Sequence, residues 1–370
     1  MPNSPYILQP ASVQRVMFKV LVALLPGIAA YVWFFGAAIL VQLALASVTA
    51  LAAEALLLKL RNKPVLLFLT DGSALVTAWL VALTFPPIAP WWLTVCGVLT
   101  AIVVAKHLYG GLGQNPFNPA MVAFCTMIVA FPQLMSQWPH VEFHDFATQL
   151  NAIFGGLLGL ERDIDAIVMA TPLDALRTVL RDPEQVATIA GVLGQQATFG
   201  NIGGRGWEWV AAGYLLGGLW LIQQRIITWH IPVAFITTLA IIATAFNMIN
   251  PDHFASAHFH LFTGGAMLGA FFIATDPVSG STTPLGKLIF AAGAALLMLV
   301  IRNFGAYPDG MAFAILLMNL LVPLIDMHTQ PKVFGHKSPP RSPRSARPSP
   351  QGAEKLLGRP GEFLDGKKEP

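Results

Sequence analysis

The sequence predicts an all-α polytopic membrane protein, with roughly ten transmembrane helices in two inverted five-helix repeats that contain broken helices. The chain of 370 residues is 55% hydrophobic and only 11% charged, whereas soluble domains carry about 25% charged residues. A helix needs about 20 apolar residues to cross a bilayer, and several stretches without any Asp, Glu, Lys or Arg are longer than that. They are 20–53, 72–105, 107–141, 226–251 and 253–275.

The individual spans follow from the length of these stretches and from the Pro and Gly residues that interrupt them. No cleavable signal peptide is expected, because the polar N-terminus leads into further spans and not into a cleavage site. The predicted spans lie near 17–35, 38–58, 66–85, 90–108, 117–131, 207–224, 231–249, 261–275, 286–302 and 309–325.

The spans divide the chain into four predicted segments. Residues 1–131 form the first transmembrane half, and 207–326 form the second. Between them lies a polar loop, 132–206, that holds eight of the nineteen acidic residues. The last segment, 327–370, is rich in Pro, Ser, Lys and Arg and too poor in apolar residues to fold alone, so we expect a disordered basic tail.

The basic residues predict the orientation, because Lys and Arg gather on the cytoplasmic side of membrane proteins. With the N-terminus in the cytoplasm, eight basic residues near span ends and all nine of the tail lie inside, and five lie outside. This excess of seventeen basic residues inside over five outside predicts that both termini are cytoplasmic and that the loop 132–206 is extracytoplasmic.

A short internal repeat supports two halves. The segment "LFLTDGSALVTA" (67–78) in the third span is similar to "LFTGGAMLGA" (261–270) in the eighth. Each segment lies in the third span of a group of five, so the two groups have opposite topology. This arrangement predicts inverted repeats whose broken helices meet near the midplane.

Two motifs inside the spans admit both a structural and a functional interpretation. Asp71 is an intramembrane carboxylate, which makes it a candidate ion-path residue, but it can equally be the N-cap of a half-helix interrupted at Asp71-Gly72-Ser73. Asn118-Pro119-Ala120 fits a helix start or a cofactor or ion-path site; a water pore would need two copies of this motif. His253, His258 and His260 lie at a loop-to-helix junction, so no metal site is expected there, and no catalytic residue is assigned.

Thr171, in "DAIVMATPLDALRT" (165–178), lies in the polar loop. Its spacing predicts a helix N-cap, with Pro172 at the first helical position. No nucleophilic triad surrounds it, and no glycine-rich phosphate loop precedes it. Spacing alone does not assign it any chemistry.

Several long motifs resemble one membrane protein family, the D subunits of the Rnf (Rsx) ion-translocating electron transport complex. That family is related to the B subunits of the sodium-pumping NADH:quinone reductase, and the resemblance extends from residue 6 to about 336. The motifs are "DGSALVTAWLVALTFPPIAPWW" (71–92), "KHLYGGLGQNPFNPAMVAF" (106–124), "GGAMLGAFFIATDPVSGSTTPLGKLIF" (264–290) and "YPDGMAFAILLMNLLVPLID" (307–326).

The resemblance implies a covalent flavin. Proteins of this family carry FMN joined through its phosphate to a threonine, in a pattern like D-x-x-[S/T]-G-A-T. Asp165, Ala170 and Thr171 match this pattern, whereas Val168 and Met169 replace its hydroxyl residue and its glycine. Thr171 is therefore the expected FMN phosphoryl threonine, and a flavin transferase is an expected partner. The family also implies a second, non-covalent riboflavin, whose contacts we do not assign.

A second segment, "DPVSGST" (276–282), fits the same pattern except at Ser281 and points to Thr282. This loop is cytoplasmic in the predicted topology, whereas the family is flavinylated on the outer face. We therefore prefer Thr171.

The function that the resemblance implies is electron relay through covalent FMN, in a bacterial inner-membrane complex that couples ferredoxin or NAD chemistry to cation transport. The other subunits of that complex and the lipid bilayer are the expected partners, and no nucleic acid is. The alternative is a small-solute channel or transporter with no redox role, because inverted repeats with broken helices also suit such proteins.

Overall fold

The computed structural model of the chain describes residues 12–142, 144–159, 167–181, 188–195, 198–200 and 202–331. The chain divides into two units, residues 1–329 and 330–370. All helices and strands of the described residues belong to the first unit. Asp165 and the predicted tail beyond residue 331 lie outside the described residues.

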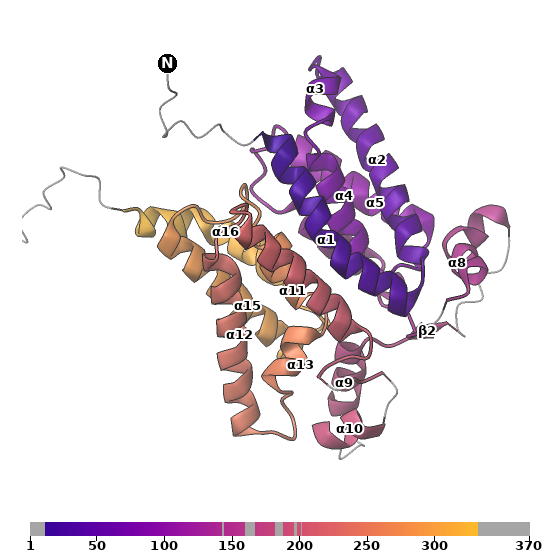
Figure 1. Cartoon of the computed structure of the whole chain (residues 1–370), viewed down its shortest axis with the longest axis vertical. Helices are drawn as coiled ribbons and strands as arrows, with labels where there is room; N and C mark the ends of the chain where they lie inside the picture. Colours follow the sequence, from indigo (N-terminus) through magenta and orange to yellow (C-terminus); the bar gives the residue numbers. More distant parts are fainter. Residues whose placement is uncertain are drawn as a thin grey trace, which may run out of the picture. The chain divides into compact units, whose positions relative to one another are not determined.

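Most helices of the first unit form two successive groups, and these helices overlap the ten predicted spans (Figure 1). The first group consists of α1 (Val13–Phe35), α2 (Ala38–Leu60), the pair α3 (Val65–Leu69) and α4 (Ser73–Thr84), α5 (Trp91–Leu99) with the π-helix η1 (Thr100–His107), and α6 (Pro119–Ala130). The second group consists of α11 (Trp207–Gln223), α12 (His230–Ile249), α13 (Ala257–Phe262) with α14 (Ala266–Leu268) and the π-helix η2 (Gly269–Ile273), α15 (Pro284–Phe304) and α16 (Met311–Thr329).

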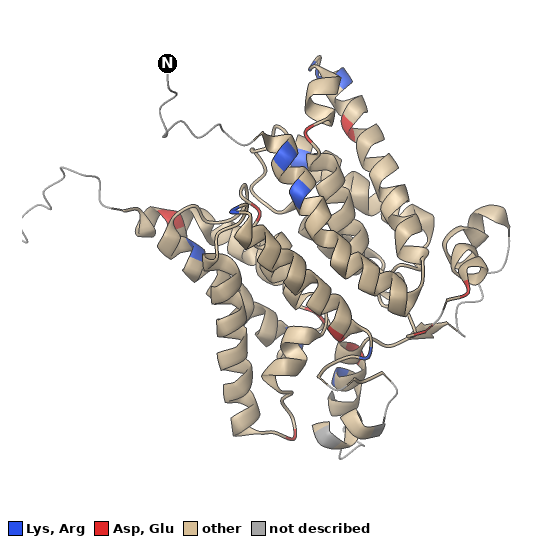
Figure 2. Ribbon diagram, in the orientation of Figure 1, with Lys and Arg blue, Asp and Glu red and all other residues tan. Residues whose placement is uncertain are grey.

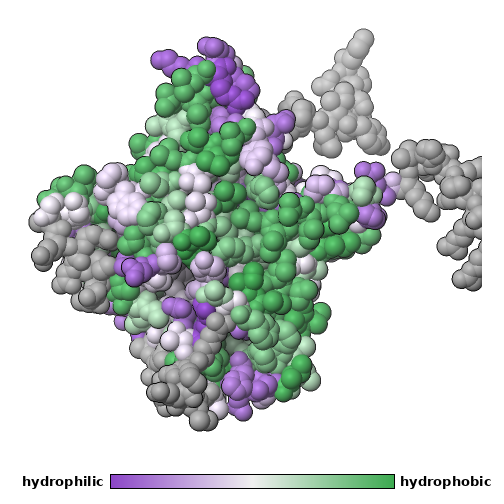
Figure 3. Space-filling view, turned by 180° about the vertical axis from the view of Figure 1, so that it is seen from behind, coloured by the Kyte–Doolittle hydropathy of each residue, from purple (hydrophilic) through white to green (hydrophobic). Residues whose placement is uncertain are grey.

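The surface of these helices is apolar, as a lipid-facing surface should be. Large hydrophobic side chains such as Trp33 and Met248 are 75% and 79% exposed, and hydrophobic residues cover much of the face in Figure 3. Exposed apolar area on this scale indicates a membrane environment. Five helices, α1, α2, α12, α15 and α16, are long and apolar enough to cross a membrane. The predicted all-α polytopic membrane fold is confirmed.

The first helices of the two groups run antiparallel. A Cβ added to Gly206, just before α11, would lie 3.2 Å from the ring of Phe35 at the end of α1. At the other end of the pair, Lys19 near the start of α1 donates to Gln224, just after α11, at 2.8 Å. The two groups are therefore related by inverted topology, as the internal repeat predicts.

Small residues allow α1 and α11 to approach closely. A Cβ on Gly213 would lie 2.7 Å from the Cα of Gly27, and one on Gly217 would lie 1.8 Å from the carbonyl oxygen of Ala23. Without a hydrophobic driving force in lipid, helices associate through such close packing.

The third helix of each group is broken: α3 is separated from α4, and α13 from α14. The two breaks lie at opposite ends of the α1–α11 pair. The first break turns at Gly72 (φ +79°), where an added Cβ would lie 3.2 Å from that of Met17 near the start of α1. The second turns at Gly264 (φ +64°), beside Thr263. A Cβ on Gly203, shortly before α11, would lie 3.2 Å from the Thr263 hydroxyl. Because α1 and α11 are antiparallel, the two breaks lie on opposite sides of the unit.

The segment between the two groups has secondary structure of its own. A two-stranded antiparallel sheet pairs Trp138 with Met169 and Pro139 with Val168. It holds the residues just before Thr171 against Trp138, whose ring packs on Trp207 of α11. The described elements are α7 (Pro132–Met135), β1 (Trp138–Pro139), α8 (Phe146–Leu158), β2 (Val168–Met169), α9 (Pro172–Arg181) and α10 (Ile189–Gln195).

Candidate functional site

Thr171 lies between β2 and α9, at the start of a helix. Its hydroxyl accepts from the backbone N–H of Asp174 at 3.3 Å, and its carbonyl accepts from that of Ala175 at 2.8 Å. Pro172 is the first helical residue, so the predicted N-cap geometry is present. A Cβ on Gly204 would lie 2.1 Å from Pro172 Cγ, which shows how closely the chain before α11 packs on this turn.

Thr171 also lines a pocket between the two groups of helices, which we call the first pocket. Contributions come from α1, α4, α6, α11, the second break and the start of α16. Most of the lining is aromatic or aliphatic. It includes Tyr31, Phe124, Trp138, Thr171, Trp207, Tyr214, Gly265 and Asp309.

Trp207 is the centre of the aromatic wall of the first pocket. Its ring lies 5.7 Å from that of Tyr31 at an interplanar angle of 90°, and 5.2 Å from that of Trp138 at 71°. Phe35 packs against it from behind, with ring centroids 4.8 Å apart. Edge-to-face contacts of this kind hold large rings in fixed positions. The wall is therefore a rigid apolar surface of the pocket that Thr171 also lines.

The first pocket also has a polar part, which closes the second break. Asp309 accepts from the backbone N–H of Gly265 at 2.7 Å and pairs with the Arg302 guanidinium at 3.2 Å. Arg302, with a side chain only 1% exposed, also donates to the carbonyls of His260 (2.7 Å) and Thr263 (3.1 Å). Backbone groups at membrane depth need such partners.

A second pocket lies at the first break. It is lined by both groups of helices, from α1 and α4 to η1, the start of α6, and the end of η2. Its lining combines apolar helix faces with several polar side chains. The polar side chains are Ser73, Thr77, Lys106, Asn115, Asn118, Thr275 and Asp276.

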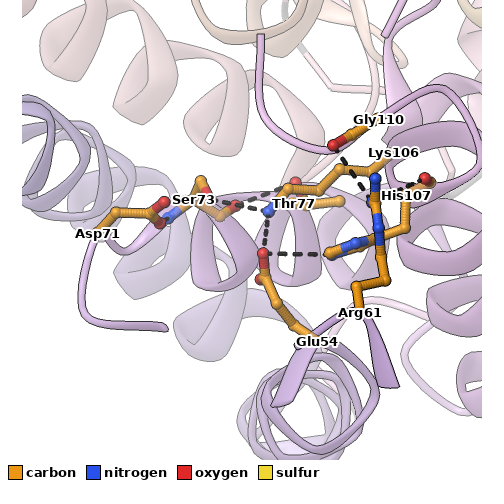
Figure 4. Close-up of polar contacts among 8 residues, drawn as sticks. All are labelled: Glu54, Arg61, Asp71, Ser73, Thr77, Lys106, His107 and Gly110. Carbon is orange, nitrogen blue, oxygen red and sulfur yellow. Dashed lines mark hydrogen bonds and ion pairs between the residues drawn. The ribbon is translucent and has the colours of Figure 1, made fainter. Parts of the chain in front are cut away.

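Buried charges extend from the second pocket towards α2 (Figure 4). The Lys106 ammonium donates to Glu54 at 2.7 Å and to Ser73 at 2.8 Å. His107 Nε2 lies 3.5 Å from the same Glu54 oxygen. The side chains of Lys106 and Glu54 are 2% and 3% exposed, and Arg61 closes this end by donating to the carbonyls of His107 and Gly110. Intramembrane charges are expensive and mark functional sites by default.

At each of the two breaks, a buried basic side chain from the next helix of the group bonds to the broken helix. Lys106 belongs to the fourth segment of the first group and reaches Ser73, the first residue after the first break. Arg302 belongs to the fourth segment of the second group and reaches Thr263 in the second break. In each group a buried basic side chain thus bonds to the broken helix that lines a pocket.

Asp71, the predicted candidate ion-path residue, lies one residue before Gly72, which is the N-cap of α4, and bonds to the first residue of that helix. Its Oδ1 accepts from the backbone N–H of Ser73 at 2.7 Å, and the side chain is half-buried. Asn118 caps α6, accepting from the N–H groups of Ala120 and Met121. The Asn118 side chain also donates to the carbonyl of Ile273 at 3.3 Å, so this cap joins the two halves beside the second pocket.

The remaining sequence candidates line neither pocket. The Thr282 hydroxyl donates to Asp326 at 2.8 Å, and its backbone N–H donates to the same carboxylate. His253, His258 and His260 do not form a cluster that could hold a metal ion, and no other such group occurs among the described residues.

One layer of side chains separates the two pockets. Tyr214 lines the first and Phe272 the second, and their rings lie 6.0 Å apart at 69°. On α6 the neighbouring residues Ala120 and Met121 line the second and first pockets respectively.

Sequence reasoning missed the pairs Glu54–Lys106 and Arg302–Asp309. A signal for the first pair was available, because Glu54 ends the charge-free stretch 20–53 and Lys106 ends 72–105. Nothing in the sequence indicates that these two residues meet.

Comparisons with known proteins place the chain among membrane redox subunits. The model described as the NQR2, RnfD, RnfE family matches residues 1–335. Two curated Escherichia coli proteins, from strains O81 (ED1a) and O127:H6 (E2348/69), are named as the D subunit of the ion-translocating oxidoreductase complex, and each is 48% identical over 347 residues. The matched region covers 90% of this chain and 98% of each relative.

Proposed function

Because the chain belongs to the NQR2, RnfD, RnfE family, we propose that it is a membrane subunit of an ion-translocating oxidoreductase complex and relays electrons through FMN bound covalently to Thr171. Other subunits of the complex supply ferredoxin or NAD chemistry and most of the ion path. The energies are compatible: moving one cation against about 150 mV requires roughly 3.5 kcal/mol, and a two-electron step supplies this from a potential drop of about 75 mV.

The observation that carries the proposal is the position of Thr171 on the lining of an aromatic pocket. A phosphoester needs a hydroxyl side chain, and a flat aromatic ring system needs an apolar site that excludes water. Thr171, Trp138 and Trp207 provide these on one pocket. Bound there, FMN accepts two electrons together and releases them singly, while the protein supplies position and electrostatics.

The proposal assigns the second pocket to the non-covalent riboflavin that the family resemblance implies. Its lining combines apolar helix faces with the amides of Asn115 and Asn118 and the ammonium of Lys106. Ligand sites of this kind place a few polar groups in a mainly apolar wall to fix orientation. Asn115 is 5% exposed and donates to the carbonyl of Phe117, so its side-chain oxygen can accept from a bound flavin.

The same proposal includes the orientation of the chain. With both termini in the cytoplasm, the segment 132–206 lies outside, in the periplasm, where a flavin transferase reaches Thr171. The described Lys and Arg residues concentrate near one end of α1 to α4 (Figure 2), which supports this orientation by the positive-inside rule.

Mass spectrometry of proteolytic peptides tests both the function and the orientation. We expect an FMN adduct on the tryptic peptide 163–177 of the chain purified from membranes, because this peptide carries Thr171. The peptide that carries Thr282 should be unmodified, since that loop faces the cytoplasm in the proposed orientation. An adduct on Thr282 alone would require the orientation to be inverted, and two unmodified peptides would favour the channel or transporter without a redox role.

A role for Asp71 on the ion path is a separate proposal, supported by its half-buried carboxylate at the first break. Asn supplies a capping oxygen about as well as Asp. We therefore expect Asp71→Asn to lower ion uptake into membrane vesicles without lowering the amount of inserted protein. If Asp71→Asn transports normally and only Asp71→Leu fails, the carboxylate is a helix cap and nothing more.

A further inference from the structure

Two tyrosines that line the first pocket carry hydroxyls with no hydrogen-bond partner in the described part of the chain. Tyr31 on α1 and Tyr214 on α11 both line the pocket and are 1% and 5% exposed. Neither hydroxyl has a hydrogen-bond partner among the residues that the structure describes. Buried polar groups are nearly always hydrogen-bonded, so each exception needs an explanation.

Other polar side chains of the same pocket are bonded within the protein. The Thr84 hydroxyl donates to the carbonyl of Leu80 at 2.9 Å, and the Trp138 indole donates to that of Met135 at 3.2 Å. Asp309 accepts from Gly265 at 2.7 Å. The two tyrosine hydroxyls therefore stand apart from these side chains.

Packing accounts for the rings of these tyrosines but not for their hydroxyls. The Tyr31 ring contacts Trp207 edge to face. The Tyr214 ring contacts Phe272 and lies so close to Gly27 that an added Cβ there would be 2.3 Å from it. Phenylalanine would make the same ring contacts without the hydroxyl. Burial of an unpaired hydroxyl destabilises a protein, so packing alone would favour phenylalanine. The hydroxyls therefore indicate a hydrogen-bonding ligand inside the pocket.

We propose that Tyr31 and Tyr214 donate hydrogen bonds to the isoalloxazine ring of the FMN attached to Thr171, which places that ring inside the first pocket. This inference rests on the proposed function. The ring nitrogens and carbonyl oxygens of a flavin are acceptors, and they become more electron-rich on reduction. Donors directed at them therefore stabilise the reduced form and raise the midpoint potential of the bound flavin.

The test uses the purified complex with Tyr31→Phe and Tyr214→Phe, and with Tyr109→Phe as a matched control. Tyr109 is 48% exposed and lines neither pocket. Flavin fluorescence in a denaturing gel reports attachment. A spectroscopic redox titration reports the midpoint of the flavin step that Thr171→Ala removes.

We expect all three variants to keep the gel fluorescence of the wild type. Each pocket variant should shift the equilibrium towards oxidised flavin by about tenfold, the loss of one hydrogen bond to a charged acceptor, which is about 30 mV for a two-electron couple. The Tyr109→Phe midpoint should not move. Unchanged midpoints in both pocket variants would overturn the tyrosine assignment and leave the covalent flavin intact. A wild-type chain without gel fluorescence would refute the proposed function itself.

Discussion

Replacement of Thr171 by alanine is expected to remove all covalently bound flavin from the chain while leaving the chain inserted in the membrane. The phosphoester needs the side-chain oxygen, and alanine has none. The position lies outside the predicted spans, at the first turn of α9. Loss of the capping hydroxyl should destabilise this turn by only about 1 kcal/mol. Denaturing-gel fluorescence and the amount of chain in the membrane fraction are the two measurements.

Thr282→Ala is the matched control for Thr171→Ala. Both positions carry a threonine in a segment similar to the flavinylation pattern, but the Thr282 hydroxyl already bonds to Asp326 and lines neither pocket. We expect full fluorescence in Thr282→Ala. Thr171→Ser keeps the oxygen and should retain part of the label. Persistent fluorescence in Thr171→Ala would remove the basis for placing FMN in the first pocket.

Features that depend on local sequence were predictable. The ten spans follow from charge-free length, and the similarity of 67–78 to 261–270 predicts two broken helices. The structure has breaks at Gly72 and Gly264, on opposite sides of the unit. A left-handed backbone favours glycine, because glycine has no Cβ. Each break is therefore marked in the sequence by a glycine.

Features that depend on distant pairs were not predictable. Glu54 and Lys106 are 52 residues apart, and the strand just before Thr171 pairs with β1 across the loop. The interpretation of Asp71 as the notable intramembrane carboxylate overlooked Glu54, which is more deeply buried. Hydropathy shows that a charge interrupts a span, but the three-dimensional packing decides whether a second charge meets it.

The same logic predicts a large effect at the Glu54–Lys106 pair. Lys106→Met leaves the Glu54 carboxylate buried beside the second pocket without its ammonium partner. Breaking a buried ion pair in this way destabilises a protein by about 3–5 kcal/mol. We expect the thermal unfolding midpoint in detergent to fall by roughly 6–15 °C, together with loss of non-covalent flavin.

The double variant Glu54→Gln/Lys106→Met separates charge from packing. Because it removes both charges, its midpoint should lie above that expected from the sum of the single changes. The exposed pair Arg205–Glu142 has an N–O distance of 2.6 Å, close to the 2.7 Å of the buried pair, but its side chains are 50% and 64% exposed. Arg205→Met should therefore lower stability by less than about 1 kcal/mol. Equal losses in Lys106→Met and Arg205→Met would mean that burial of the first pair has no energetic consequence. A larger loss at Lys106, partly recovered in the double variant, would identify the carboxylate left without its partner as the cause.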